Sequence, residues 1–175
     1  MTEPVIPTYQ LLRDNLRFLR ARKSFDSDMP QRKTLPHRIP DWVDRDDHWF
    51  ITICCTPRGE NQLATASTFG TLAESLRFRE ARGDLKVAIL TAMPDHVHFI
   101  CQINHHRGMS KMIKDLKGYL AKMRGVRWQE GYFDHRLRNP SEYLDKYAYV
   151  RRNPVRAGFC ASPEDWRYTY ERTDG

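Results

Sequence analysis

The residues of this sequence best suited to bind a metal ion are two histidines separated by one residue. His96 and His98 belong to the run MPDHVHFI, residues 93–100. In a strand, alternate side chains point to opposite faces, so both imidazoles would project from one open face while Val97 points into the core. Neutral imidazole binds several divalent metals. The pattern by itself fits two unrelated surface histidines equally well. It does not fit a histidine-triad nucleotide hydrolase, which needs a further histidine where Ile100 stands.

Tyr149 and Asn153 form a second pair with chemical potential. Residues four apart on a helix share a face, so the phenol and the amide would point toward the same place. A phenol can attack phosphorus, and an amide oxygen can complete the coordination of a metal. The alternative is that Tyr149 packs in the core, because Tyr143 and Tyr147 belong to the apolar side of the same segment.

Basic residues surround these candidates. The chain carries 29 Lys and Arg against 22 Asp and Glu, which gives a formal net charge of +7 and a pI near 9.4. Residues 107–127 hold seven of the basic residues and a single acidic one, and residues 136–156 hold six against two. A basic surface of this kind favours an anionic partner, most simply nucleic acid.

Two groups of basic residues are the candidates for contact with nucleic acid. Lys111, Lys114 and Lys117 recur every three residues along a predicted helix, where they form either a contact surface for DNA phosphates or only a solvated face. The second group consists of arginines that flank the tyrosine, and we expect them to contact phosphates or to read guanine edges. Its members are Arg136, Arg138, Arg151, Arg152 and Arg156.

The elements that must position these residues alternate between strands and helices. Strands are predicted at 48–55, 86–93, 96–103 and 132–137, and helices at 69–82 and 109–123. Asn139 and Pro140 begin a last helix, which is expected to end near Asn153 because Pro154 disfavours helical backbone in the residue before it. This order predicts an α+β fold in which an antiparallel sheet carries helices on one face.

The first 40 residues are predicted to be an appendage to a main domain at 41–175. Helical spacing of apolar residues predicts a short amphipathic helix over 9–19, and the polar, proline-containing segment 26–40 predicts an extended arm. No apolar run approaches the ~20 residues of a membrane span, and the amino terminus lacks a signal-peptide pattern. The four cysteines form no CxxC pair, so a disulfide framework or a thiolate zinc site is not expected. We therefore expect a cytoplasmic protein.

Three ordered segments resemble the single-tyrosine HUH transposases, an IS200-like family. They are MPDHVHFI at 93–100, WQEGYFDH at 128–135 and YVRRNPVRAG at 149–158. The run NPVRAG at 153–158 and the later segment EDWRY at 164–168 are similar in particular to the REP-associated tyrosine transposases, a domesticated branch of that family. The resemblance spans roughly residues 45–170. Mobile relatives carry Gln where Asn153 stands, and the shorter amide is expected in this branch.

The resemblance implies a fold, a reaction and a metal. The fold is a ferredoxin-like or RRM-like antiparallel sheet of the HUH endonuclease type. Tyr149 would attack a phosphodiester of single-stranded DNA at a repeat hairpin, which leaves a 5′-phosphotyrosine and a free 3′-OH. His96, His98 and Asn153 would hold one Mg²⁺ or Mn²⁺ on the scissile phosphate. Such proteins act in the cytoplasm at the nucleoid, as monomers or homodimers.

Two other functions fit the same residues. One is a nucleic-acid-binding protein that keeps the fold and the basic face without catalysis. The other is a metal-dependent phosphodiesterase that uses water in place of tyrosine. Formation of a covalent protein–DNA adduct separates the strand transferase from both.

Overall fold

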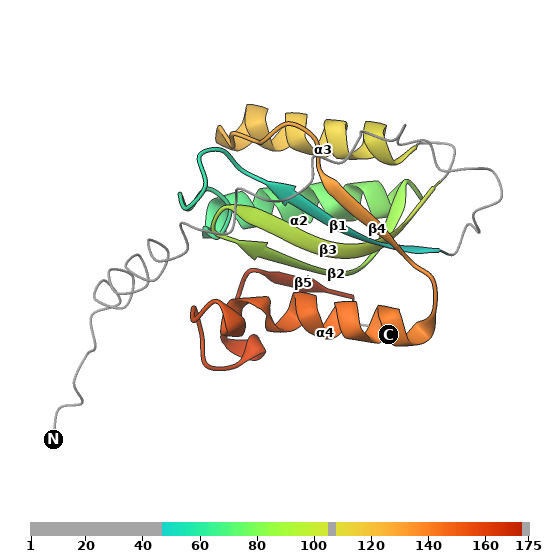
Figure 1. Ribbon diagram of the computed structural model, residues 1–175. Helices are drawn as coiled ribbons and strands as arrows, with labels where there is room; N and C mark the ends of the chain where they lie inside the picture. The colour runs from blue at the N-terminus through green and yellow to red at the C-terminus, as the bar shows by residue number, and fades with distance from the viewer. Residues whose placement is uncertain (1–46, 105–107, 173–175) are drawn as a thin grey trace, which may run out of the picture. The chain divides into compact units, whose positions relative to one another are not determined.

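The computed structural model describes residues 47–104 and 108–172, which form one antiparallel sheet with helices on both of its faces (Figure 1). The helix and arm predicted within residues 1–40 lie outside the described residues. None of the helices in the described ranges combines the length and the apolar character that crossing a membrane requires.

The sheet contains five strands in the order β4-β1-β3-β2-β5, and every neighbouring pair is antiparallel. The strands are β1 (His48–Cys54), β2 (Leu85–Met93), β3 (His96–Ile103), β4 (Phe133–Leu137) and β5 (Thr169–Glu171). The predicted α+β class with an antiparallel sheet is confirmed. The short edge strand β5 was not predicted, because three residues are too few for a periodic pattern.

The two faces of the sheet carry separate apolar clusters. The helices are α2 (Ala66–Ala81), α3 (Met109–Arg124) and α4 (Pro140–Arg156). Helices α2 and α3 cover one face, as predicted, where Phe99 and Leu116 are buried. The prediction that all helices lie on one face is wrong for α4, which lies on the opposite face (Figure 1), where Val150 packs with Phe50 and Ile100. The face that carries the histidines is therefore apolar over part of its length, and α4 covers it.

The ends of α2 and α3 follow from local capping. Helix α2 begins three residues before the predicted start, because the side chain of Thr65 accepts a hydrogen bond from the backbone N–H of Thr68 (3.2 Å). Gly125 adopts a left-handed conformation and ends α3. The side chain of Met123, in the last turn of α3, is 50% exposed.

Helix α4 continues through its proline. Asn139 caps its amino terminus and Pro140 occupies the first turn, as predicted. The prediction that α4 ends near Asn153 is wrong, since the helix extends to Arg156. Pro154 removes one backbone donor, but the N–H of Ala157 still donates to the carbonyl of Asn153 (2.9 Å). The proline ring is buried, and this burial offsets the missing hydrogen bond.

Candidate active site

The two histidines lie at the start of β3 and face the α4 side of the sheet. Strand alternation places His96 and His98 on this side, while Val97 packs in the core under α2 and α3. In the strand register, His98 lies between Thr52 of β1 and Thr91 of β2. The prediction that the histidines share one face is confirmed by this register.

A carboxylate fixes the ring of His96. Its Nδ1 atom lies 2.7 Å from an oxygen of Asp95. The other Asp95 oxygen accepts a hydrogen bond from the backbone N–H of Gly59 (2.6 Å) and pairs with the guanidinium of Arg58 (3.1 Å). Burial alone would raise the pKa of Asp95, but the hydrogen bonds from His96 and Gly59 lower it overall, so this carboxyl is ionised at neutral pH. An ionised acceptor at Nδ1 leaves Nε2 of His96 as the atom that can bind a metal.

His98 is held in the same way by a neutral partner. Its Nδ1 atom lies 2.8 Å from the hydroxyl oxygen of Thr52, and its ring stacks on Phe50 at 5.6 Å between centroids. The face was expected to be open, but His98 is only 7% exposed because α4 covers it. Burial, with a smaller contribution from the nearby His96, lowers the pKa of His98 to about 3. The ring is therefore neutral at physiological pH, which is the form that binds metals.

The donor set fits a divalent metal ion. The ring centroids of His96 and His98 lie 4.7 Å apart. In each ring Nδ1 is hydrogen-bonded, so Nε2 is the atom that would bind a metal. Asp95 and Thr52 thus orient the two rings as outer partners orient metal-binding histidines. Within the described residues, no group of three or more His, Cys, Asp or Glu side chains is placed to hold a metal ion. Carbonyl-type oxygens, such as that of an amide side chain, also bind divalent metals.

Tyr149 of α4 lies beside the histidines. Its ring centroid is 5.4 Å from that of His98 and 6.0 Å from that of Phe50. Two cations lie over the same ring, since the guanidinium carbon of Arg156 is 5.0 Å and the ammonium nitrogen of Lys146 is 5.6 Å from its centroid. The half-buried phenol therefore lies next to the candidate metal ligands in a positively charged setting.

Asn153 follows Tyr149 by one helical turn. Because α4 is continuous through both residues, they share a helix face, and both are half-buried. The prediction that Tyr149 and Asn153 share one face of a helix is therefore confirmed.

Tyr147 is a poor alternative nucleophile. Its hydroxyl donates a hydrogen bond to the carboxylate of Glu171 (2.9 Å). Burial and this carboxylate raise the pKa of Tyr147 well above its usual range, which disfavours the phenolate. This hydrogen bond therefore favours Tyr149 over Tyr147 as the candidate nucleophile.

The predicted arginines differ in what they contact. Arg152 and Arg156 are exposed on the helix that carries Tyr149, and Arg138 is exposed at the end of β4. Arg151 pairs with Glu164 (2.8 Å), so part of its charge is used within the protein. Arg136 pairs with Asp47 (3.3 Å).

Arg136 also faces away from the histidines. In the β1–β4 ladder Arg136 lies directly opposite Trp49, and Trp49 packs on the apolar cluster under α2 and α3. The structure therefore does not bring Arg136 to the histidine face.

The three lysines of α3 lie on the layer opposite the histidines. Lys117 donates hydrogen bonds to the backbone carbonyls of Gln129 (2.7 Å) and Gly131 (3.0 Å), and burial lowers its pKa. Lys111 pairs with Asp115 at 3.1 Å, whereas Lys114 is exposed. The structure does not bring these residues to Tyr149.

Several residues of the site were not predicted from the sequence. Lys146 precedes Tyr149 by three residues, and this helical spacing was a usable signal. Asp95 belongs to the histidine motif, but no role was assigned to it. Thr52 meets His98 through strand register, and Arg58 meets Asp95 through loop geometry. The sequence offers no local signal for either contact.

Comparisons with known proteins agree with this geometry. Residues 48–151 match the family model described as "Transposase IS200 like". The chain is similar to the REP-associated tyrosine transposase of Escherichia coli (strain K12), with 22% identity over 124 residues that cover 69% of this chain and 74% of that protein. It is also similar to a solved structure of a REP-associated tyrosine transposase bound to a REP hairpin, with a TM-score of 0.65 and 19% identity over 75% of this chain and 80% of that one. The resemblance predicted from the motifs is confirmed, and the last likeness shows the shared fold.

Proposed function

The chain belongs to the IS200-like transposase family, and we propose that it is a metal-dependent strand transferase that cleaves single-stranded DNA at repeat hairpins. Tyr149 is the nucleophile in this proposal. The observation that carries it is the 5.4 Å approach of the Tyr149 and His98 rings, which joins a candidate nucleophile to a candidate metal site.

The reaction exchanges one phosphodiester for another. The hydroxyl oxygen of Tyr149 forms a bond to phosphorus, and the bond from phosphorus to the 3′ oxygen of the preceding nucleotide breaks. The phenol loses one proton and the leaving oxygen gains one, so the products are a 5′-phosphotyrosine and a free 3′-OH. Because the bond energy is kept in the phosphotyrosine, the reverse reaction can rejoin strands without an external energy source.

His96, His98 and Asn153 are the residues that would hold Mg²⁺ or Mn²⁺. When bound, such an ion neutralises charge on the scissile phosphate and assists the leaving oxygen. Asp95 and Thr52 keep the two imidazoles in the orientation that presents Nε2.

The cations beside Tyr149 attract the DNA backbone. Lys146 and Arg156 lie over its ring, and Arg152 is exposed on the same helix. We assign this surface to the single strand. Lys111 and Lys114, on the other layer, are assigned to the phosphates of the paired stem.

The test is incubation of the protein with hairpin DNA and Mn²⁺, followed by denaturing electrophoresis. A covalent adduct that resists SDS is expected. Cleavage without an adduct would favour attack by water, and binding without cleavage would favour a protein that only binds nucleic acid. Because one chain supplies both Tyr149 and the histidines, we expect sedimentation to show that the active species is a monomer.

A further inference from the structure

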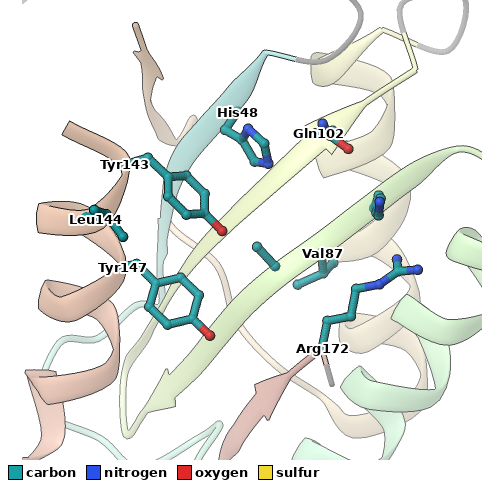
Figure 2. Close-up of a pocket in the computed structure, with 9 residues that line it drawn as sticks. His48, Val87, Gln102, Tyr143, Leu144, Tyr147 and Arg172 are labelled. Carbon is teal, nitrogen blue, oxygen red and sulfur yellow. The ribbon is translucent and has the colours of Figure 1, made fainter. Parts of the chain in front are cut away.

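A pocket of about 380 Å³ opens between α4 and the sheet, at the end of β3 away from the histidines (Figure 2). Six of the residues that line it matter here: His48, Lys86, Gln102, Tyr143, Tyr147 and Arg172. Neither Tyr149 nor the histidines of β3 line it. The pocket is therefore distinct from the candidate active site.

Aromatic rings form one wall of the pocket. Tyr143 and Tyr147 project from α4 over the strands (Figure 2), with ring centroids 5.9 Å apart and an angle of 36° between the rings. His48 meets Tyr143 edge to face at 4.8 Å, and the bond from Tyr147 to Glu171 fixes the second ring. Rigid rings of this kind are the surfaces on which unpaired bases stack.

The charge of the pocket favours an anion. Lys86 and Arg172 are the charged residues among its described lining, and both are cations. No acidic side chain is among these lining residues. A phosphate at the mouth of the pocket would meet both cations.

Hydrogen-bonding groups lie at the strand end. His48 and Gln102 are direct neighbours across the β1–β3 ladder, and both line the pocket. An imidazole and an amide supply the donors and acceptors that read the edge of a base. The volume is near the lower limit for small-ligand sites, so it suits one nucleotide rather than a longer segment.

We propose that this pocket binds one unpaired nucleotide of the DNA strand, with its base against Tyr143 and its phosphate near Lys86 and Arg172. This proposal rests on the function proposed above. Gln102 lies four residues beyond His98 on β3, or about 13 Å along the strand. The bound nucleotide is therefore within a few positions of the scissile phosphate, and the pocket contributes to the choice of cleavage position.

The test combines base removal in the DNA with ring removal in the protein. Hairpin substrates carry a single abasic site at each unpaired position near the cleavage point, and binding is measured by fluorescence anisotropy. For the wild-type protein, one position should weaken binding roughly 5- to 150-fold, the range for loss of one stacked base. For Tyr143→Ala, the intact substrate should show a similar loss, and the abasic site at that position should cost nothing more.

Three further variants serve as controls. Tyr143→Phe keeps the ring and should bind like the wild type. Tyr119→Ala removes an exposed tyrosine of α3, on the other layer, and should leave the abasic profile unchanged. Lys86→Gln should lower the slope of log affinity against log salt by roughly 0.7, and it tests the pocket even if Tyr143→Ala is unstable.

Two outcomes would overturn the proposal. One is that Tyr143→Ala leaves the abasic profile unchanged and Lys86→Gln leaves the salt slope unchanged. The other is binding of free deoxynucleoside monophosphates in the pocket, detected by NMR and lost in Tyr143→Ala, while no DNA strand is bound. If the wild-type protein forms no adduct, the proposed function is contradicted instead. The abasic profile would still show whether the pocket binds an unpaired nucleotide.

Discussion

The ring of Tyr149 lies 5.4 Å from the ring of His98, although one residue belongs to α4 and the other to β3. The contact exists because Val150, the next residue of the helix, is fully buried against Phe50 and Ile100 on the sheet. Packing of α4 therefore sets the position of the phenol. One chain therefore brings Tyr149 and His98 together in this structure.

Tyr149→Phe should abolish the covalent adduct and leave hairpin binding nearly unchanged, because only the hydroxyl is lost from a half-buried ring. Tyr147→Phe is the matched control, since it removes the neighbouring hydroxyl and its bond to Glu171. Denaturing electrophoresis of the DNA complexes measures the adduct. An adduct that persists in Tyr149→Phe and disappears in Tyr147→Phe would contradict the assignment.

Asp95→Asn should weaken metal binding roughly 10- to 100-fold, the range for loss of the outer partner of a metal-binding histidine. The ring of His96 would lose the ionised acceptor that orients it. The measurement is the Mn²⁺ concentration that gives half-maximal cleavage, together with the rise in Tm on adding Mn²⁺. Asp115→Asn, on α3, is the control and should change neither quantity. Equal metal dependence of Asp95→Asn and the wild type would show that the carboxylate has only a structural role.

The stability of the metal-free protein should fall as the pH is lowered below 6.5. The folded protein lowers the pKa of His98 to about 3, whereas the unfolded chain keeps the ordinary pKa of histidine, 6.5. Between these values the unfolded state binds more protons, so acid favours unfolding. For this residue the change from pH 6.5 to 5.5 amounts to about 1 kcal/mol.

Urea unfolding with EDTA at several pH values measures this effect. In His98→Gln, the loss of stability over the same interval should be smaller by about that amount. Because His96 and all other titrating groups remain, the difference between the two pH profiles isolates His98. Parallel profiles would mean that His98 titrates normally in the folded protein.

Two double variants should separate the two DNA surfaces. Arg152→Gln with Arg156→Gln should lower the salt slope for a single-stranded oligonucleotide by about 1.4, and Lys111→Gln with Lys114→Gln should lower that for a hairpin stem by about 1.8. Anisotropy titrations across a salt series measure both slopes. An unchanged stem slope in the lysine variant would show that α3 is only a solvated face.

Patterns of short range predicted much of this structure. The two-residue spacing of the histidines correctly placed them on one strand face, and the four-residue spacing of Tyr149 and Asn153 placed them on one helix face. Asn139 marked the start of α4 through its side-chain acceptor. Each of these features depends only on residues within a single strand or helix.

Features that depend on distant partners were not predicted. The hydrogen bond between His98 and Thr52 requires the β1–β3 register. The hydrogen bond from Lys117 to the carbonyl of Gln129 requires the path of the chain after α3. A run of basic residues likewise does not show which of them pair inside the protein, as Arg151 does with Glu164. The extent of α4 beyond Asn153 depended on burial of Pro154 rather than on its local preference.

The two halves of the site also differ in how they form. A tight turn joins β2 to β3, so the pairing that presents His96 and His98 closes a short loop and has a low entropy cost. Tyr149 arrives only when α4 docks across the sheet, and Val150 and Pro154 are the buried residues of that helix. An element with so little buried surface opens at a lower free energy than the central strands. Transient undocking of α4 would thus withdraw the proposed nucleophile while the histidine hairpin stays folded. Under the proposed function, the occupancy of the docked helix sets the fraction of molecules that are competent to react.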